Sequence, residues 1–142
     1  MRDLDTIRLA LTAAGTEHLV FGTLHTTSAA KTIDCVIDVF PAAEKDRVRS
    51  SLSESLQAVI SQTLLKKKTG GRVAAHEIMR GPPAIRHLIR ENKVAQTYSA
   101  KQTGQAIGTQ TMDQCLQKLV EKRVISVEVA REKAKQPDSI AA

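Results

Sequence analysis

The sequence predicts an α/β fold, in which helices cover a sheet that contains buried strands. Leu4, Ile7 and Leu11 recur at steps of three and four within residues 3–14, which is the spacing of an amphipathic helix. The run HLVFGTL at residues 18–24 is apolar and too short for a helix, a pattern typical of a strand covered on both faces. A helix followed by such a strand is the arrangement of α/β proteins with parallel sheets.

Two more helices are expected after this strand. Residues 26–28, Thr-Thr-Ser, are good N-caps for a helix that Pro41 ends. A longer helix is expected over about 42–63, because apolar residues recur along one of its faces. Its apolar stripe consists of Val48, Leu52, Leu56, Val59 and Ile60.

A β-hairpin is expected within residues 63–79. Two extended segments flank Gly70 and Gly71, and glycine readily takes the positive φ that a tight hairpin turn requires. Residues 66–68, three lysines, form a run of positive charge just before the turn.

Short helices are predicted from Pro82 onward. Prolines suit the start of a helix, Thr111 with Gln114 forms a capping box, and Ser126 is an N-cap. The expected elements are helices over 82–92 and 93–104, a loop over 105–110, helices over 112–122 and 127–135, and a frayed tail over 137–142.

The net charge of +6 is unevenly distributed along the chain. Residues 1–64 carry six Lys/Arg and eight Asp/Glu, net −2, whereas residues 65–142 carry fifteen and seven, net +8. A basic half suits an acidic partner, whether nucleic acid, a membrane surface or an acidic protein, and it equally suits a solvated surface.

Cysteine usage and hydropathy predict a cytoplasmic protein with no membrane insertion. Cys35 and Cys115 lie far apart without metal-site spacing, so buried free thiols of a reducing compartment are expected rather than a disulfide. No window approaches 18 apolar residues, and the N-terminus does not resemble a signal peptide.

His25 is a candidate ligand-binding residue, because it lies at the carboxyl end of the predicted strand, where open α/β sheets bind ligands. Its imidazole could donate a hydrogen bond to a phosphate oxygen there. His18 lies at the start of the strand, and residues seven apart in a strand point to opposite faces, so the two are not a chelating pair. Spacing alone leaves open whether His25 contacts a ligand or only packs.

The C-terminal helices allow a second interpretation, a small nucleic-acid-binding protein. Arg86, Arg90 and Lys93 share one helix face, which a solvated surface would explain, and the apolar face of Ile85, Leu88 and Ile89 is either core or a docking surface. The helices over 112–122 and 127–135 resemble a helix-turn-helix in outline, and a basic half suits DNA phosphates. The turn lacks glycine, however, and the last helix lacks the Asn and Gln that read base edges. The sequence contains no GxxxxGK[ST], GxGxxG, GxSxG or HExxH motif.

Taken together, the segments MRDLDTIRLALTAAG, HLVFGTLHTTSAAKTIDCVIDVF, GGRVAAHEIM and PAIRHLIREN resemble the pilus-retraction ATPases of the type IV pilus and type II secretion family. The resemblance runs from Met1 to about Lys135. It implies the C-terminal half of a RecA-like P-loop ATPase core, over residues 1–80, followed by a small helical C-terminal subdomain over 81–136 and a tail over 137–142.

The resemblance also assigns roles to individual residues. Arg2 and Asp3 match the end of the family's Walker B segment, whose glutamate would lie just before Met1. HLVFGTLHTTSAA matches the His box, so His25, with His18 in the same element, is expected to couple the γ-phosphate region to subunit contacts. The retraction motif AIRNLIRE matches eight residues, with His87 in place of the family asparagine. These eight are Ala84, Ile85, Arg86, His87, Leu88, Ile89, Arg90 and Glu91.

The resemblance implies ATP hydrolysis with Mg²⁺ in a homo-hexamer at the cytoplasmic face of the inner membrane, working with the type IV pilus platform to drive twitching motility. Phosphoryl transfer needs a phosphate cradle, Mg²⁺ and a positioned water. The family's Walker A loop and catalytic glutamate lie upstream of the matched segment, so this chain alone is expected neither to bind ATP tightly nor to hydrolyse it. Two alternatives remain: a small nucleic-acid-binding protein, although the resemblance implies no nucleic-acid partner, and a non-catalytic interaction fragment.

Overall fold

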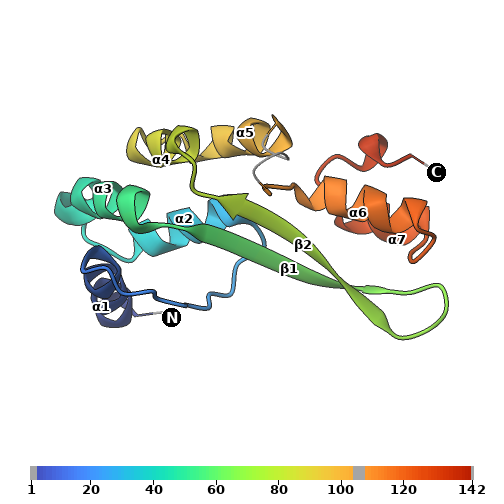
Figure 1. Ribbon diagram of the computed structural model, residues 1–142, viewed down its shortest axis with the longest axis horizontal. Coiled ribbons are helices and arrows are strands. Elements are labelled where there is room, and N and C mark those ends of the chain that lie inside the picture. The colour runs from blue at the N-terminus through green and yellow to red at the C-terminus, as the bar shows by residue number, and fades with distance from the viewer. Residues whose placement is uncertain (1–2, 104–107, 142) are drawn as a thin grey trace.

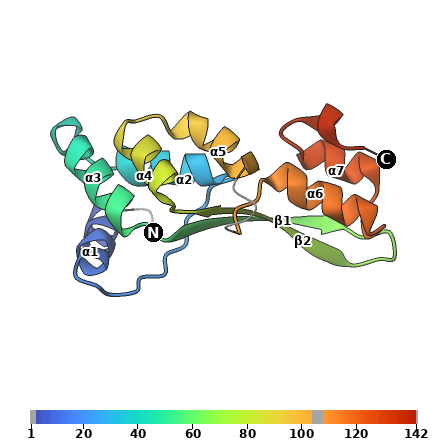
Figure 2. The same cartoon turned by 45° about the horizontal axis from the view of Figure 1, so that its top comes forward.

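The computed structural model describes residues 3–103 and 108–141, in which a long antiparallel hairpin carries helices along one face (Figures 1 and 2). Arg2 and part of the predicted 105–110 loop lie outside the described residues. In chain order the elements are α1 (Leu4–Gly15), α2 (Ala29–Asp38), η1 (Ala42–Glu44), α3 (Lys45–Ser55), β1 (Ala58–Lys66), β2 (Arg72–Arg80), α4 (Pro83–Arg90), η2 (Val94–Gln96), α5 (Thr97–Thr103), α6 (Met112–Glu121), α7 (Val127–Lys133) and η4 (Pro137–Ser139).

The hairpin is confirmed, and it is longer than the sequence predicts. β1 pairs with β2 from Ala58 opposite Arg80 to Lys66 opposite Arg72. Gly70 and Gly71 have φ of 88° and 73° in the turn, conformations that cost a residue with a Cβ considerably more. The hairpin runs along the long axis of the molecule, with α1–α3 at one end and α6 and α7 near the turn (Figure 1).

The predicted helix over 42–63 is wrong beyond Ser55. The chain is helical in α3 and then becomes the strand β1. Val59 continues the helical spacing of Leu52 and Leu56, and it also falls on the buried side of a strand, so the apolar pattern was ambiguous. β-branched residues in this stretch favour the extended form, and pairing with residues 72–80, far along the chain, stabilises it.

The predicted strand over residues 18–24 does not form. The segment between α1 and α2 is extended, but it belongs to no ladder of the described residues. Leu19 and Phe21 are 74% and 89% exposed. A strand needs a neighbour for its backbone N–H and C=O groups, and no described strand lies beside this segment to supply one.

Two apolar clusters form the core. The first joins α1, α2, α3 and α4 to one end of the hairpin, with Ile33, Met79 and Ile89 fully buried. The second joins α6 and α7 to the other end around Leu65 and Leu116. α4 therefore packs with elements that precede residue 80, and the division of the chain at residues 80 and 81 stays a prediction.

Two smaller expectations are wrong. The tail is not frayed, because Ile140 is 1% exposed and packs in the second cluster, and the Ala141 N–H donates to Gln117 Oε1 at 3.0 Å. Cys35 is exposed rather than buried, whereas Cys115 is half-buried, and both are free thiols.

Within the described part of the chain, no helix has the length and apolar character needed to span a bilayer.

Candidate functional site

The segment that leads from α1 to α2 carries both candidate histidines. α1 ends at Gly15, and Glu17 takes a left-handed φ of 65°, which turns the chain away from the helix. His18 Nδ1 lies 3.1 Å from Thr16 Oγ1 and 3.0 Å from the Thr16 carbonyl oxygen. The exposed His18 imidazole is thus engaged locally, at the end of α1.

His25 lies at the other end of this segment, exposed, three residues before Ser28. Ser28 is the N-cap of α2, because its Oγ accepts a hydrogen bond from the Lys31 N–H at 3.3 Å. Thr26 Oγ1 lies 2.6 Å from Thr32 Oγ1, and Thr32 Oγ1 donates to the Ser28 carbonyl at 2.9 Å. The residues after His25 are therefore tied to the first turn of α2, while its imidazole faces solvent.

Glu77 of β2 is a buried carboxylate that sequence reasoning missed. It is 5% exposed, and its Oε2 accepts a hydrogen bond from the Ala29 N–H at 2.8 Å, across 48 residues of sequence. Because side chains alternate along a strand, Val73, Ala75, Glu77 and Met79 lie on the same side of β2. A single acid among apolar residues on that side was the signal in the sequence for a buried carboxylate. The first N–H of α2 is thereby taken by an anion supplied by the hairpin.

Asp3, which the resemblance assigns to the flank of the Walker B segment, has a structural contact here. Asp3 is the N-cap of α1, and its Oδ2 accepts hydrogen bonds from the Thr6 N–H at 2.9 Å and from Thr6 Oγ1 at 2.6 Å. These bonds hold the pKa of Asp3 below its ordinary value. Arg2 lies outside the described residues.

The described residues fit only part of a nucleotide site. Residues 3–103 and 108–141 contain no group of three His, Cys, Asp or Glu side chains that could hold a metal ion. The N-terminus of α2, which in other proteins is a place for phosphate, is occupied by the Glu77 carboxylate. His25 is an exposed group in this region that can hydrogen-bond a phosphate oxygen.

The second candidate site is α4, which begins at Pro83 as two prolines predict and buries one face against the first cluster. Ile85 and Ile89 are buried and Leu88 is half-buried, as the helical spacing indicates. Ala84, His87, Arg90 and Glu91 are exposed, and Lys93 beyond the helix is exposed as well.

Arg86 differs from the other charged residues of α4. Its Nε donates to the Gly81 carbonyl at 2.7 Å, and its Nη1 donates to the Glu54 carbonyl at 2.7 Å. Glu54 lies in the last turn of α3, where carbonyl groups have no partner within the helix. Arg86 is therefore engaged in joining α4 to α3 and to the end of β2.

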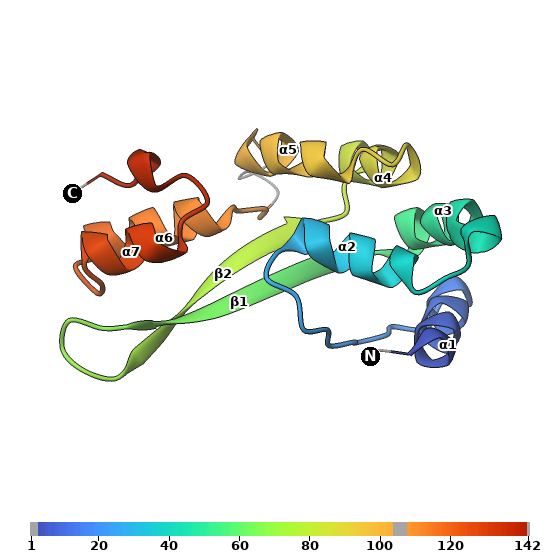
Figure 3. The same ribbon diagram turned by 180° about the vertical axis from the view of Figure 1, so that it is seen from behind.

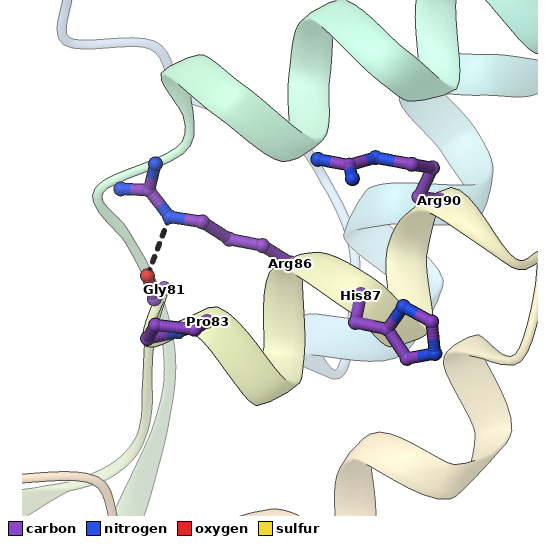
Figure 4. A pocket seen from close by; sticks show the side chains of 5 residues that line it. All are labelled: Gly81, Pro83, Arg86, His87 and Arg90. Atoms are coloured by element: carbon purple, nitrogen blue, oxygen red, sulfur yellow. Dashed lines mark hydrogen bonds between the residues drawn. The ribbon is translucent and has the colours of Figure 1, made fainter.

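A hollow of about 430 Å³ is lined by Gly81, Pro83, Arg86, His87 and Arg90. Arg86 and Arg90 extend toward the same side of α4, and His87 points away from them (Figure 4). Neither His18 nor His25 lines this hollow. The segment from His18 to His25 and the hollow on α4 are therefore two separate candidate sites.

Comparison with known proteins identifies relatives over nearly the whole chain. The profile of the type II/IV secretion system protein family matches residues 1–136. A type IV pilus retraction ATPase, PilT, of Pseudomonas aeruginosa is 75% identical over 139 residues, which cover 98% of this chain and 40% of the relative. A twitching motility protein of Neisseria gonorrhoeae is 64% identical over 141 residues, 99% of this chain and 38% of the relative. The chain thus spans about 40% of the length of these relatives.

Solved structures agree with these relatives. The crystal structure of the pilus retraction motor PilT with bound ADP superposes with a TM-score of 0.87 at 49% identity, over 97% of this chain and 38% of that one. The ATPase DotB of Legionella pneumophila superposes with a TM-score of 0.79 at 28% identity, over 93% of this chain and 36% of that one. The mixed arrangement of helices and strands is therefore that of an ATPase segment.

Proposed function

The chain belongs to the type II/IV secretion system protein family, and from this membership we propose that it forms the C-terminal part of a hexameric ATPase that powers type IV pilus retraction. The observation that carries the proposal is the 75% identity to a pilus retraction ATPase over 98% of the chain. As in such a motor, the chain would act in the cytoplasm at the inner-membrane face, with the pilus platform as its partner.

Within this motor, His25 is the residue that we assign to the nucleotide. It would hydrogen-bond a γ-phosphate oxygen that residues outside the matched segment hold, while His18 supports the start of the same segment. The exposed position of His25, just before a firmly capped helix, supports this assignment. A neutral imidazole carries one N–H donor and one acceptor nitrogen, so the ring can donate or accept a hydrogen bond here.

The exposed side of α4 is assigned to retraction rather than to hydrolysis. His87 and Arg90 line an open hollow, and Glu91 is exposed at the end of the helix. Ile85, Leu88, Ile89 and Arg86 instead hold α4 in place, the last through its two carbonyl contacts. Ala84 is exposed at the start of the helix.

The isolated chain is assigned no hydrolysis of its own. Phosphoryl transfer is accelerated by positioning and electrostatic stabilisation, with Mg²⁺ neutralising charge on the phosphates. The described residues contain no metal-binding cluster, and the anion position at the start of α2 is taken by Glu77. ATP and Mg²⁺ would therefore be bound chiefly by residues beyond the matched segment.

A fusion protein tests this function. The matching C-terminal segment of the P. aeruginosa relative is replaced by this chain, and ATP hydrolysis and twitching of a strain that lacks the native gene are measured. We expect hydrolysis and twitching in the fusion, loss of hydrolysis in its His25→Ala variant, and hydrolysis without twitching in Arg90→Ala. A folded hexameric fusion that does not hydrolyse ATP would contradict the proposal.

The nucleic-acid alternative finds no support in the structure of the last two helices. α6 and α7 bury Leu116 and Ala130 against the hairpin, and the exposed side of α7 mixes Glu128 and Glu132 with Arg131. α7 contains no Asn or Gln, the residues that read adenine by paired hydrogen bonds. The alternative of a non-catalytic interaction fragment is tested by co-expressing the 142-residue chain with the full-length relative. Loss of twitching in the strain that carries both proteins would favour this alternative.

A further inference from the structure

Glu77 is a charged side chain buried in the first core cluster, where burial is costly unless the charge is compensated. It is 5% exposed, and its Oε2 accepts a hydrogen bond from the Ala29 N–H at 2.8 Å. Ala29 is itself 0% exposed, so water does not compete for this bond. Ionised carboxylates are rarely buried in proteins without such a partner.

The partner of Glu77 lies at a particular point of the chain. Ala29 is the first residue of α2 and comes four positions after His25. The first N–H groups of a helix have no partner within it, and the positive end of the helix dipole attracts a carboxylate. Figure 3 shows the start of α2 beside the two strands, where the hairpin passes beneath it.

The start of α2 already has local caps, so capping alone does not explain why β2 supplies the Glu77 carboxylate to it. Ser28 already caps the helix, and the Thr26 and Thr32 hydroxyls hold the loop to its first turn. Those contacts fix the loop to the helix, but they do not fix the helix to the sheet. The hydrogen bond from the Ala29 N–H to Glu77 joins the helix to β2, four residues after His25.

We propose that Glu77 is a positioning residue for His25: its carboxylate fixes the start of α2 on β2 and thereby sets where the imidazole lies relative to the nucleotide. The proposal rests on the proposed function, because it assumes that His25 acts on a phosphate oxygen. Glu77 touches neither nucleotide nor reacting atoms in this scheme and acts through Ala29 and the loop that precedes it.

The first experiment measures position in the 142-residue chain itself, independently of activity. Amide hydrogen exchange is followed by NMR in Glu77→Ala, in Glu77→Gln, which keeps size and an acceptor oxygen, and in Asp113→Ala. Asp113 is a matched control, because it is also a buried carboxylate that accepts backbone N–H groups, those of Lys135 and Gln136, but in the second cluster.

Exchange of the Ala29 and Lys31 amides is expected to rise roughly tenfold or more in Glu77→Ala, as loss of a charge-assisted hydrogen bond implies, and much less in Glu77→Gln. Asp113→Ala should raise exchange at Lys135 and Gln136 and leave Ala29 unchanged. Unchanged exchange at Ala29 in Glu77→Ala, or an equal rise across the whole hairpin, would overturn the proposal. If Glu77→Ala does not fold, Glu77→Gln decides: a small rise of exchange confined to Ala29 and Lys31 supports the proposal, and no change from the unaltered chain contradicts it.

The second experiment measures catalysis in the fusion protein described above. Glu77→Ala is expected to lower kcat by roughly ten- to a hundredfold with little change in KM, because misplacing a catalytic group affects the chemical step more than binding. Glu77→Gln should recover most of kcat, and Asp113→Ala should keep it. Retention of full kcat by Glu77→Ala would contradict the proposal. Inactivity of the unaltered fusion would contradict the proposed function instead, and the exchange experiment would still decide the role of Glu77.

Discussion

Arg86 Nη1 donates to the carbonyl oxygen of Glu54 across 2.7 Å, and this bond joins α4 to the last turn of α3 although 32 residues separate the two positions. The same guanidinium also donates from Nε to the Gly81 carbonyl. Arg86, the first arginine of the predicted retraction motif, is therefore an anchor of the fold. Arg90, one turn later, is exposed and remains available to a partner.

Replacing Arg86 is expected to destabilise the protein. In Arg86→Lys the ammonium cannot reach two carbonyls in the fixed geometry of a guanidinium, so the free energy of unfolding should fall by about 1–2 kcal/mol. Urea unfolding followed by circular dichroism measures the change. Arg90→Lys is the matched control and should change the free energy of unfolding by less than about 0.5 kcal/mol. Equal effects of the two substitutions would contradict the anchoring role.

Gly81→Ala is expected to destabilise the junction between β2 and α4. A Cβ at this position would lie 2.5 Å from the Leu56 carbonyl oxygen, so the backbone of one segment must shift. A cost of about 1–3 kcal/mol is expected, measured by thermal or urea unfolding. Gly15→Ala, where nothing lies within 4 Å of the added Cβ, serves as control and should be neutral or slightly stabilising. A neutral Gly81→Ala would show that this approach of the two backbones is looser than described.

Glu44→Gln is expected to remove part of the acid sensitivity of the fold. Arg8 Nη1 lies 2.7 Å from Glu44 Oε2, and this bond holds the pKa of Glu44 below its ordinary value of 4.5. Because the unfolded state takes up the proton at higher pH, the pair stabilises the fold fully above about pH 4.5 and loses this contribution as the pH falls through the lower folded pKa. Unfolding experiments between pH 7 and pH 3 should show the native and Glu44→Gln proteins converging toward low pH. A constant difference would contradict the role of this ion pair.

Asp34→Asn is expected to stabilise the protein at neutral pH, whereas Glu44→Gln is expected to destabilise it. Asp34 is exposed, but desolvation by the atoms packed around its carboxyl group raises its pKa, the neighbouring Asp38 carboxylate adds to the shift, and Arg49 opposes it. The fold therefore disfavours the charged form, and this penalty grows as the pH rises from the ordinary value of 3.8 through the folded pKa. Asp34→Asn is expected to unfold at higher temperature than the native protein at pH 7 and at about the same temperature at pH 3. A lower melting temperature at pH 7 would contradict the prediction.

Ile140→Ala is expected to destabilise the second cluster, although the residue lies close to the end of the chain. Ile140 is 1% exposed, and Asp113 holds the preceding segment through the Lys135 and Gln136 N–H groups. Removing a buried isoleucine side chain costs about 2–4 kcal/mol, which urea unfolding measures. Ile60→Ala makes the same change on the outer side of β1, where the side chain is 64% exposed, and should cost much less. Similar losses at both positions would show that the tail does not contribute its packing in solution.

The sequence by itself determined the features that depend on residues close together in the chain. Asp3, Ser28, Thr111 and Ser126 are N-caps because each accepts a bond from an N–H three residues away. Gly70 and Gly71 likewise make the turn of the hairpin through their own backbone freedom. The segments over residues 1–15, 18–40, 70–79 and 83–92, taken together, were sufficient to identify the family, since each is a local property of the sequence.

Only the tertiary structure decided the features that depend on distant partners. Residues 58–63 form a strand because residues 72–80 pair with them, and residues 18–24 form no strand because no described strand lies beside them. Glu77 and Arg86 acquire their contacts across 48 and 32 residues, distances over which apolar periodicity carries no information. A backbone hydrogen bond or a buried charge is stable only when its partner is present, and the folded chain decides which partner that is.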